Sequence, residues 1–362
     1  MKFIFLFLVV IHGLIHIMGF LKAFELAKLD QLTQSISKPV GVVWLLTLLL
    51  FLLAAIFFLF QMENWWIPAA VAVVLSQLVI ILSWQDAKFG TIMNVIILLV
   101  VIVGMATWKF TSETAKELEN LLAENETSTA LITEEMLHDL PSNVRTWLNH
   151  VGVVGREDID TISFRQIGEM KLEPDGKWSA SEAEQYVTTG TPGFWWRVSV
   201  DMLPVVDVVG RDLFRGGTGD MKIKVASLFP VVNVSNNEKV DQSTMQRFLL
   251  ELPLFPTAAL QPYISWKEVD PFTAEAQMRY EGMEAIASFH FDKNGSGELV
   301  RVSAFRYKDH DEKAEPIECI GQIHEYEEIN GLRIPVKVDI SWVLEGEPFT
   351  WYRFEVVDFR LQ

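Results

Sequence analysis

The sequence predicts a membrane protein of the α + β class, with four N-terminal transmembrane helices followed by a mainly antiparallel β domain that contains one inserted helix. Three observations lead to this prediction. Residues 1–108 carry a net charge of +1, whereas the rest of the chain carries −18. Long uncharged apolar runs fill the same N-terminal third. Beyond Gly152 the apolar pattern changes to a period of two, which is typical of strands.

Four segments are long and apolar enough to cross a bilayer, which requires a helix of about 20 residues. Pro39 and Pro68 suit the first turns of the second and third helices. The first run, which follows Lys2, could also indicate a cleaved signal peptide, but no small-residue cleavage site follows it, so we expect it to remain as a span. The expected spans cover about residues 3–21, 39–62, 65–84 and 90–108.

The lysine distribution predicts the orientation, because short cytoplasmic loops are enriched in Lys and Arg. The loops at about residues 22–38 and 85–89 hold four lysines, against three near the membrane on the opposite side. We therefore expect a multi-pass protein of the cytoplasmic (inner) membrane with its large C-terminal domain on the extracytoplasmic side. The single cysteine, Cys319, excludes an intrachain disulfide framework.

The strong negative charge outside the spans excludes nucleic acid as a partner, because such a surface repels phosphates. The histidines of this part are scattered, and no serine lies in a nucleophile elbow, so we predict no catalytic residue, metal or cofactor there. The segment 292–298 matches the first half of a calcium loop, but the twelfth position is Ser303 in place of glutamate. We interpret this segment as a glycine-rich hairpin turn.

Two histidines lie inside the first predicted span. His12 and His16 are four residues apart and share one helix face, and ionisable groups at that depth are candidates for a functional site. Bis-histidine haem ligation would need the two histidines to approach the haem from opposite faces, which two residues on one helix face cannot do. A metal site would need a third ligand, and the available carboxylates lie at the helix ends, where they are poorly placed. Hydrogen bonding between helices is the favoured interpretation. The candidate partners are Ser76, Gln77, Asn94 and Thr47.

The chain divides into a transmembrane region (residues 1–110), a helical linker (111–152) and a β-rich domain (153–362). The clearest alternation runs from Leu332 to Trp342 after an Asn-Gly turn. A helix over residues 241–252, capped by Asp241 or Ser243, interrupts the strands. Ten or so antiparallel strands with one helix predict a large curved sheet or an open barrel. Strand segments cover 161–172, 178–187, 194–202, 208–214 and 221–228, and others begin at Ile264, Ala274, Ala285, Leu299, Ile317, Leu332 and Phe349.

Large apolar side chains are more frequent around the inserted helix than alternation requires. Trp195 and Trp196 must face opposite sides of their strand, so both faces are covered or bind a ligand. Core packing under the helix is one interpretation, and a hydrophobic ligand cleft is the other. Arg247 and Glu251 should form an exposed ion pair on another face of the helix. The candidate cleft residues are Phe194, Trp195, Trp196, Met245, Phe248, Leu249, Leu252 and Phe255.

A series of short motifs runs from about Pro141 to Phe359. They are Glu184-Gln185-Tyr186, Pro192-Gly193-Phe194, Trp196, Phe229-Pro230, Arg247, Glu251, Phe255-Pro256-Thr257-Ala258 and Ile334-Pro335. In these motifs the sequence resembles a bacterial membrane-anchored family known only as a domain of unknown function. The resemblance implies architecture and no activity. The hairpin from Tyr326 through Gly331 to Pro335 is also similar to that of the periplasmic lipoprotein-carrier fold, a half-open barrel with a helical lid over an apolar cavity.

These observations favour a non-enzymatic, membrane-tethered binding or carrier-like module for a hydrophobic ligand, such as a lipid or acyl chain. One alternative is a structural or envelope-assembly protein whose aromatic residues form only core. The other is a membrane enzyme that uses His12 and His16. The expected partners are the lipid bilayer and a hydrophobic small molecule or lipid.

Overall fold

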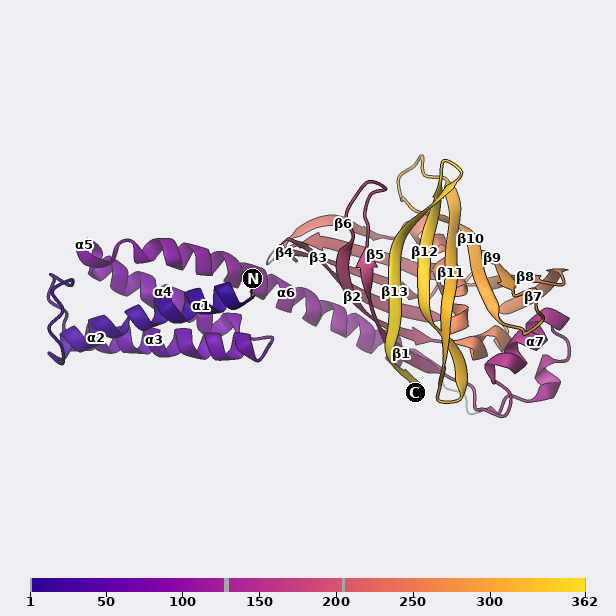
Figure 1. The fold of residues 1–362 in the computed structure, drawn as a ribbon, viewed down its shortest axis with the longest axis horizontal. Coiled ribbons are helices and arrows are strands. Elements are labelled where there is room, and N and C mark those ends of the chain that lie inside the picture. The colour runs from indigo at the N-terminus through magenta and orange to yellow at the C-terminus, as the bar shows by residue number, and fades with distance from the viewer. Residues whose placement is uncertain (1, 127–129, 204–205, 362) are drawn as a thin grey trace. The chain divides into compact units, whose positions relative to one another are not determined.

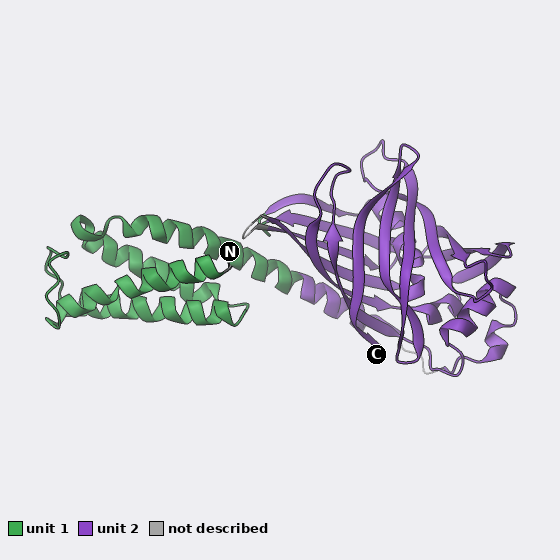
Figure 2. Ribbon diagram, viewed as in Figure 1, with its two compact units in different colours: residues 1–113, 203–206, 226–228 green, residues 114–202, 207–225, 229–362 purple. Residues whose placement is uncertain are grey.

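The computed structural model describes residues 2–126, 130–203 and 206–361. The chain forms two compact units (Figure 2). Unit 1, residues 1–113, 203–206 and 226–228, is mainly helical. Unit 2, residues 114–202, 207–225 and 229–362, is built on a β-sheet.

The helices of unit 1 include three that are long and apolar enough to cross a membrane, within the described residues. The first of these spans, Phe3–Ala23, includes most of α1 and all of α2. The apolar helix α4 has only 17 residues and ends where Ser83 leaves the helical conformation (φ −120°, ψ 38°). The predicted span at 65–84 is therefore shorter than expected, at the lower limit of about 17 residues. The helices are α1 (Lys2–Ile15), α2 (Ile17–Ala23), α3 (Lys38–Leu59), α4 (Trp66–Leu82), α5 (Trp84–Ala87) and α6 (Gly90–Ala123).

Helix α6 is longer than predicted. The fourth span was expected to end near Trp108 and a separate polar helix to follow from Thr111, but the structure has one continuous helix. The sequence between Met105 and Ala123 contains no Gly or Pro to interrupt it. Lys109 and Glu113, four residues apart, form an ion pair of 3.7 Å across the predicted break.

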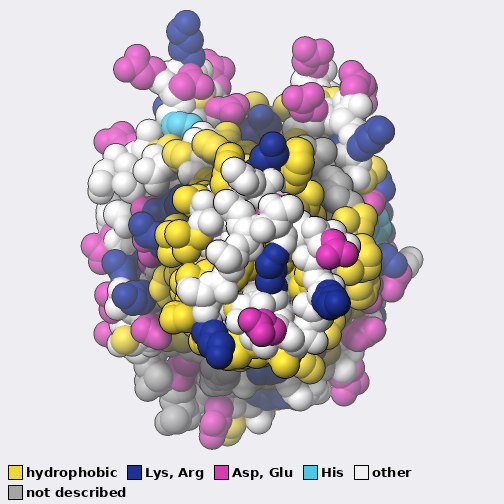
Figure 3. Space-filling view, turned by 90° about the vertical axis from the view of Figure 1, so that its left-hand side faces the viewer, with side chains coloured by type: hydrophobic (Ala, Val, Ile, Leu, Met, Phe, Trp, Pro, Cys, Tyr) yellow, Lys and Arg dark blue, Asp and Glu magenta, His cyan; other side chains and the backbone are white. Residues whose placement is uncertain are grey.

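Unit 1 has a packed interior and an apolar exterior. Phe51 and Ile97 are completely buried, and Gly19 lies so close to Trp44 that a Cβ there would meet the indole ring at 2.2 Å. Figure 3 looks at the end that carries the α2–α3 loop and α5, where charged side chains are surrounded by hydrophobic ones. Apolar sides with a charged end suit a helix bundle surrounded by lipid.

Unit 2 contains one antiparallel sheet that has 13 strands over the described residues, with the order β6-β5-β4-β3-β2-β1-β13-β12-β11-β10-β9-β8-β7. The chain forms two meanders, which β1 joins by pairing with β13, from Ile162 opposite Leu361 to Met170 opposite Tyr352. The first meander consists of β1 (Thr161–Met170), β2 (Ser179–Thr188), β3 (Gly193–Leu203), β4 (Val206–Arg215), β5 (Thr218–Val225) and β6 (Phe229–Ser235). The second consists of β7 (Ile264–Asp270), β8 (Thr273–Tyr280), β9 (Met283–Phe291), β10 (Leu299–Tyr307), β11 (Pro316–Ile329), β12 (Leu332–Leu344) and β13 (Glu347–Leu361).

The inserted helix α8 (Glu238–Leu250) connects the two edge strands of the sheet. It leads from β6 through the short helices η2 (Leu252–Leu254) and η3 (Pro256–Leu260) to β7. It contacts β5 as well as β9 and β10, which lie near opposite edges. The sheet must therefore curve around α8, as Figure 1 shows. The predicted curved sheet with one inserted helix is confirmed.

The start of α8 differs from the prediction. The capping residue is Asn237, whose side chain accepts hydrogen bonds from the backbone N–H groups of Lys239 and Val240. Asp241, a predicted cap, instead accepts from the backbone N–H of Gly219 at 2.7 Å. The other predicted cap, Ser243, donates to the Tyr307 carbonyl at 2.6 Å. Both residues thus tie the helix to the sheet.

The linker contributes two short helices, η1 (Glu134–Leu137) and α7 (Ser142–Val151). Trp147 of α7 is 1% exposed, and its ring lies 5.9 Å from that of Trp266 and 6.1 Å from that of Phe289. This part of the predicted linker therefore belongs to the core of unit 2.

Candidate functional site

A cavity of about 400 Å³ lies between α8 and the sheet. Its wall includes residues from β1, β3, β4 and β5 of the first meander and from β10, β11, β12 and β13 of the second. This volume falls within the range of about 300–1,000 Å³ that is usual for small-molecule sites. The exposed side chains of Leu172, Lys308, Asp309 and His310 are also part of the lining, so the cavity opens to the surface there.

Most of the cavity wall is apolar. Aromatic rings come from β3, β10, β12 and β13, and most of the aliphatic side chains come from α8, its following turn and the second meander. Such a surface favours contact with hydrocarbon over water. The aromatic residues are Trp196, Tyr307, Trp342, Phe349, Trp351, Tyr352 and Phe354, and the main aliphatic ones are Leu250, Leu254, Val302, Ile323, Val338 and Ile340.

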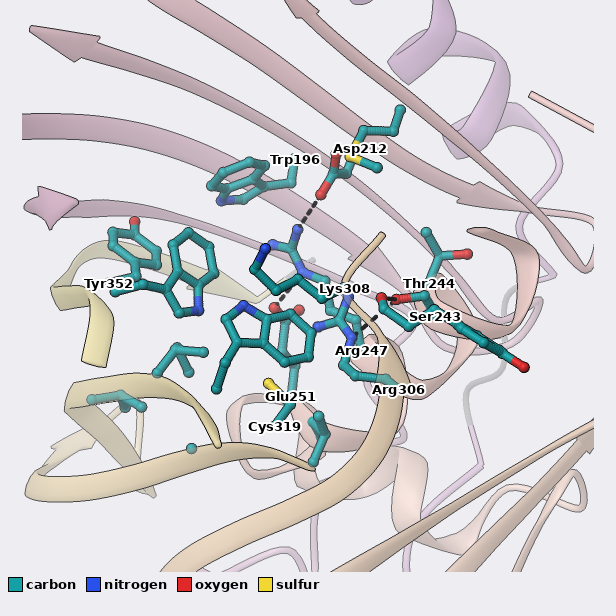
Figure 4. A pocket seen from close by; sticks show the side chains of 18 of the residues that line it. Trp196, Asp212, Ser243, Thr244, Arg247, Glu251, Arg306, Lys308, Cys319 and Tyr352 are labelled. Carbon is teal, nitrogen blue, oxygen red and sulfur yellow. Dashed lines mark hydrogen bonds and ion pairs between the residues drawn. The ribbon is translucent and has the colours of Figure 1, made fainter. Parts of the chain in front are cut away.

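A charged group lies within this apolar wall (Figure 4). Arg247 of α8 is 12% exposed and contacts two carboxylates, Asp212 at 2.8 Å and Glu251 at 2.7 Å. Its guanidinium also lies over the ring of Trp196, at 4.6 Å from the centroid. The predicted pairing of Arg247 with Glu251 is confirmed, but its predicted exposure is wrong, because the curved sheet covers that face of the helix.

A second guanidinium belongs to Arg306 of β10. Its Nε donates to the Ser243 hydroxyl at 3.1 Å, and the group lies 5.3 Å from the centroid of the Trp342 ring. A side-chain hydrogen bond links it to the thiol of Cys319. Burial lowers the pKa of Arg306 from its ordinary value and raises that of Cys319. Arginine nevertheless remains protonated in proteins, so a positive charge faces the cavity.

Two neutral donors of the wall share one acceptor. The Gln166 side-chain oxygen accepts from Trp196 Nε1 at 2.8 Å and from the Tyr352 hydroxyl at 3.1 Å. Burial raises the pKa of Tyr352 well above its usual value, so this hydroxyl remains a donor. These bonds fix two of the aromatic rings that line the cavity.

Of the eight residues predicted to line a hydrophobic cleft, the structure places Trp196 in the cavity wall. Trp195 lies on the opposite face of the sheet, packed with Leu121 of α6 and Leu213, as strand alternation requires. The others are at most 4% exposed within the core. They are Phe194, Met245, Phe248, Leu249, Leu252 and Phe255.

Sequence reasoning missed most of the cavity wall, including its charged residues. Arg306 lies in phase with Val302 and Ala304, which are buried, whereas the intervening Phe305 is 63% exposed. A cation in phase with the buried positions of a strand is the signal that could have identified it. Ser243 and Asp212 carried no comparable signal, because their positions depend on the curvature of the sheet.

His12 and His16 are buried within unit 1 and form a hydrogen-bond network between helices. His12 Nε2 lies 2.9 Å from the Asn94 side-chain oxygen, and His16 Nε2 lies 2.9 Å from the Ser76 hydroxyl. Asn94 in turn donates to Gln77 at 3.1 Å. The predicted bonding to Ser76 and Asn94 is confirmed. The other predicted partner, Thr47, donates to the Val43 carbonyl of its own helix. Among the residues that the structure describes, no cluster of three potential metal ligands occurs.

Replacing Asn94 with leucine should destabilise unit 1 by about 1–2 kcal/mol, because His12 and Gln77 lose their partner within the bundle. The free energy of unfolding can be measured by titrating the full chain in mild detergent with dodecyl sulfate. Thr47→Val is the control, because its hydroxyl makes no bond to another helix in the described structure. Equal losses from the two replacements would show that the network does not hold the helices together.

Comparison with known proteins identifies a family match. The DUF6920 family, described as a family of unknown function, matches residues 138–360. This agrees with the resemblance carried by the sequence motifs. No curated protein matches the chain.

Solved structures that resemble the chain have low identity to it. A LolA superfamily protein from Nitrosomonas europaea has 8% identity and a TM-score of 0.33, with coverage of 64% of this chain and 94% of that one. A domain from Vibrio parahaemolyticus, described as an outer membrane lipoprotein-sorting protein, has 10% identity and a TM-score of 0.31, with coverage of 56% and 85%. A DUF1329 family protein from Desulfovibrio piger has 10% identity and a TM-score of 0.32, with coverage of 61% and 92%.

Proposed function

We propose that this chain, which belongs to the DUF6920 family of unknown function, is a membrane-tethered binding or carrier-like module for a hydrophobic ligand such as a lipid or acyl chain. The observation that carries the proposal is the apolar cavity of about 400 Å³ between α8 and the curved sheet. Voids in protein interiors are few and rarely larger than a water molecule. A cavity of this size, walled by aromatic rings, is therefore better explained by a ligand than by imperfect packing.

The proposal includes an anchor in the cytoplasmic (inner) membrane. The apolar helices of unit 1 supply it, with α4 as the shortest of four proposed spans. Lys22, Lys28, Lys38 and Lys88 are in the loops proposed to face the cytoplasm, which leaves the β-rich domain on the extracytoplasmic side. On that side the domain could receive or release a ligand that comes from the envelope.

A reporter fused after Gln362 should behave as extracytoplasmic, because four proposed spans together with the lysine distribution favour that side for the C-terminus. Alkaline phosphatase, which needs an oxidising compartment, should be active in this fusion. A fluorescent protein that matures only in the cytoplasm should remain dark, and strong fluorescence would reverse the proposed orientation.

Native mass spectrometry of the full chain in detergent tests the ligand itself. A copurified species with the mass of a lipid or fatty acid, released when the protein unfolds, is the expected result. Protein without any such species would favour the structural or assembly alternative. A stoichiometric metal that is lost when His12 and His16 are replaced would favour the enzyme alternative.

The single cysteine allows the ligand to be located. Cys319 lines the cavity, is 2% exposed and has a pKa raised by burial, so slow alkylation at alkaline pH should report access to the cavity. Added dodecanoate should slow the reaction of a small uncharged thiol reagent. An unchanged rate under saturating binding would place the ligand elsewhere.

A further inference from the structure

We propose that Arg306 binds the anionic head group of an amphiphile whose alkyl chain occupies the apolar cavity. This inference rests on the proposed function and defines its ligand class: a single anionic oxygen group, carboxylate or phosphate, at the end of a hydrocarbon chain. Three observations support it. Arg306 lines the cavity. The nearby carboxylates Asp212 and Glu251 are already paired with Arg247. Contacts with Ser243 and Trp342 hold the Arg306 side chain.

Arg306 has no carboxylate partner within 4 Å in the described part of the chain, although three carboxylates line the same cavity. The exposed Asp309 lies beside Lys308. Asp212 and Glu251 are both bound to Arg247, at 2.8 and 2.7 Å. The two arginines and these two carboxylates sum to zero charge, so their long-range attraction for an anion is small. Arg306 can instead bind an anion by direct hydrogen bonds. Its terminal N–H groups have no oxygen acceptor among the described residues, whereas those of Arg247 do.

The other cations of the cavity wall are engaged or lie at its exposed rim. Lys239 donates to three backbone carbonyls, those of Asp311, Glu312 and Ala314. Lys308 is exposed and lies 3.6 Å from Asp309. Lys171 lies over the rings of Trp178 and Phe349. Arg306 is therefore the cation best placed to bind an anion inside the cavity.

The guanidinium of Arg306 is held in a fixed orientation. The Ser243 hydroxyl accepts from Nε at 3.1 Å and itself donates to the Tyr307 carbonyl at 2.6 Å, while the Trp342 ring supports one face. Nε is occupied by Ser243, and the Cys319 thiol is only a weak acceptor, so the terminal nitrogens can still bind a ligand. Guanidinium binds carboxylate or phosphate through two parallel hydrogen bonds, which a lysine ammonium cannot reproduce. Such a contact also satisfies a desolvated charge that would otherwise be costly.

The test compares three ligands with the same alkyl chain, dodecanoate, dodecyl phosphate and 1-dodecanol, by calorimetric titration of the full chain in one detergent. The wild-type protein should bind at least one anionic ligand at least tenfold more tightly than the alcohol. A preference for dodecanoate or for dodecyl phosphate distinguishes the two head groups. Inorganic phosphate without a chain should bind at least tenfold more weakly than the anionic amphiphile.

Arg306→Met should weaken binding of the preferred anion at least tenfold and leave the affinity for dodecanol unchanged. Arg306→Lys, which keeps the charge, should recover only part of the affinity. Lys313→Met is the matched control, because it removes one positive charge at an exposed position between β10 and β11 that does not line the cavity, and it should have little effect. The comparison of ligands on the wild-type chain needs no variant and remains decisive if Arg306→Met does not fold.

The outcomes separate this inference from the proposed function. Equal affinities of the wild-type chain for the alcohol and both anions would overturn the role of Arg306 but leave a hydrophobic binding module. An equal loss of anion affinity in Arg306→Met and Lys313→Met would also overturn it. No binding of any of the three amphiphiles would refute the proposed function itself.

Discussion

Replacing Arg211 with methionine is expected to destabilise the β-rich domain by about 3–5 kcal/mol, the usual cost of removing one partner from a buried ion pair. The side chain is fully buried (0% exposed). Its Nε lies 2.7 Å from Glu117 of α6, and a terminal nitrogen lies 2.6 Å from Asp220 of β5. Methionine would leave both carboxylates without this partner, although Lys222 still contacts Glu117 at 2.8 Å.

Chemical denaturation of the full chain in detergent, followed by tryptophan fluorescence, measures the change. Arg165→Met is the matched control: Arg165 is also paired with two acids, Glu182 and Asp358, but its side chain is 45% exposed, so the loss should be below about 1 kcal/mol. The double replacement Arg211→Met/Glu117→Met should recover part of the loss, because it removes one of the two carboxylates that lose Arg211 as a partner. Equal losses in Arg211→Met and Arg165→Met would show that burial does not make the Arg211 pair important.

The parts of the fold that depend on local pattern were predictable from the sequence. The alternation from Leu332 to Trp342 places Leu332, Ile334 and Val336 in the core at no more than 3% exposed. The turn before it has Asn330 and Gly331 at φ 52° and 74°, as a two-residue hairpin loop between β11 and β12 requires. Likewise, the segment 292–298 is a turn between β9 and β10, in which Asp292 accepts from the backbone N–H groups of Asn294 and Ser296.

Edge and boundary positions were less predictable. Strand β6 was missed because it is an edge strand with weak burial: Phe229 is 67% exposed and Val231 is 65% exposed. The segment expected to continue as a strand to residue 228 instead turns at Ala226 and Ser227, which adopt φ of 52° and 58°. Neither residue type signals a left-handed conformation.

The composition of the cavity depends on tertiary structure. The large apolar residues of the inserted helix were predicted to line a cleft or to form core, and they lie in the core. Only the curvature of the sheet decides that residues in phase with Arg247 also become enclosed. Thus Ser243, Arg247 and Leu250 line the cavity, while Met245 and Phe248 lie in the core. A helix covered on several faces cannot be assigned a ligand face from its period alone.

This division of α8 leads to the second large prediction. Phe248→Ala should destabilise the β-rich domain by about 3–5 kcal/mol, because Phe248 is fully buried and truncation leaves a void that the core cannot close. Its ring lies 5.0 Å from that of Phe255, 6.2 Å from that of Phe214 and 6.3 Å from that of Tyr263. These contacts are with protein, so affinity for dodecanoate in the fraction that remains folded should change little.

Leu250→Ala on the same helix should give the opposite result. Leu250 is 9% exposed and lines the cavity, so part of its surface faces the space for the ligand. Its truncation should therefore destabilise the domain by about 2 kcal/mol, the lower end of the range for truncating a buried leucine. Its loss should weaken dodecanoate binding several-fold, because the removed methyl groups would contact the alkyl chain. Unfolding and calorimetric titrations of both variants check the pair. If Phe248→Ala weakens binding more than Leu250→Ala while costing less stability, the ligand lies on the core side of α8 and the assignment of the cavity is wrong.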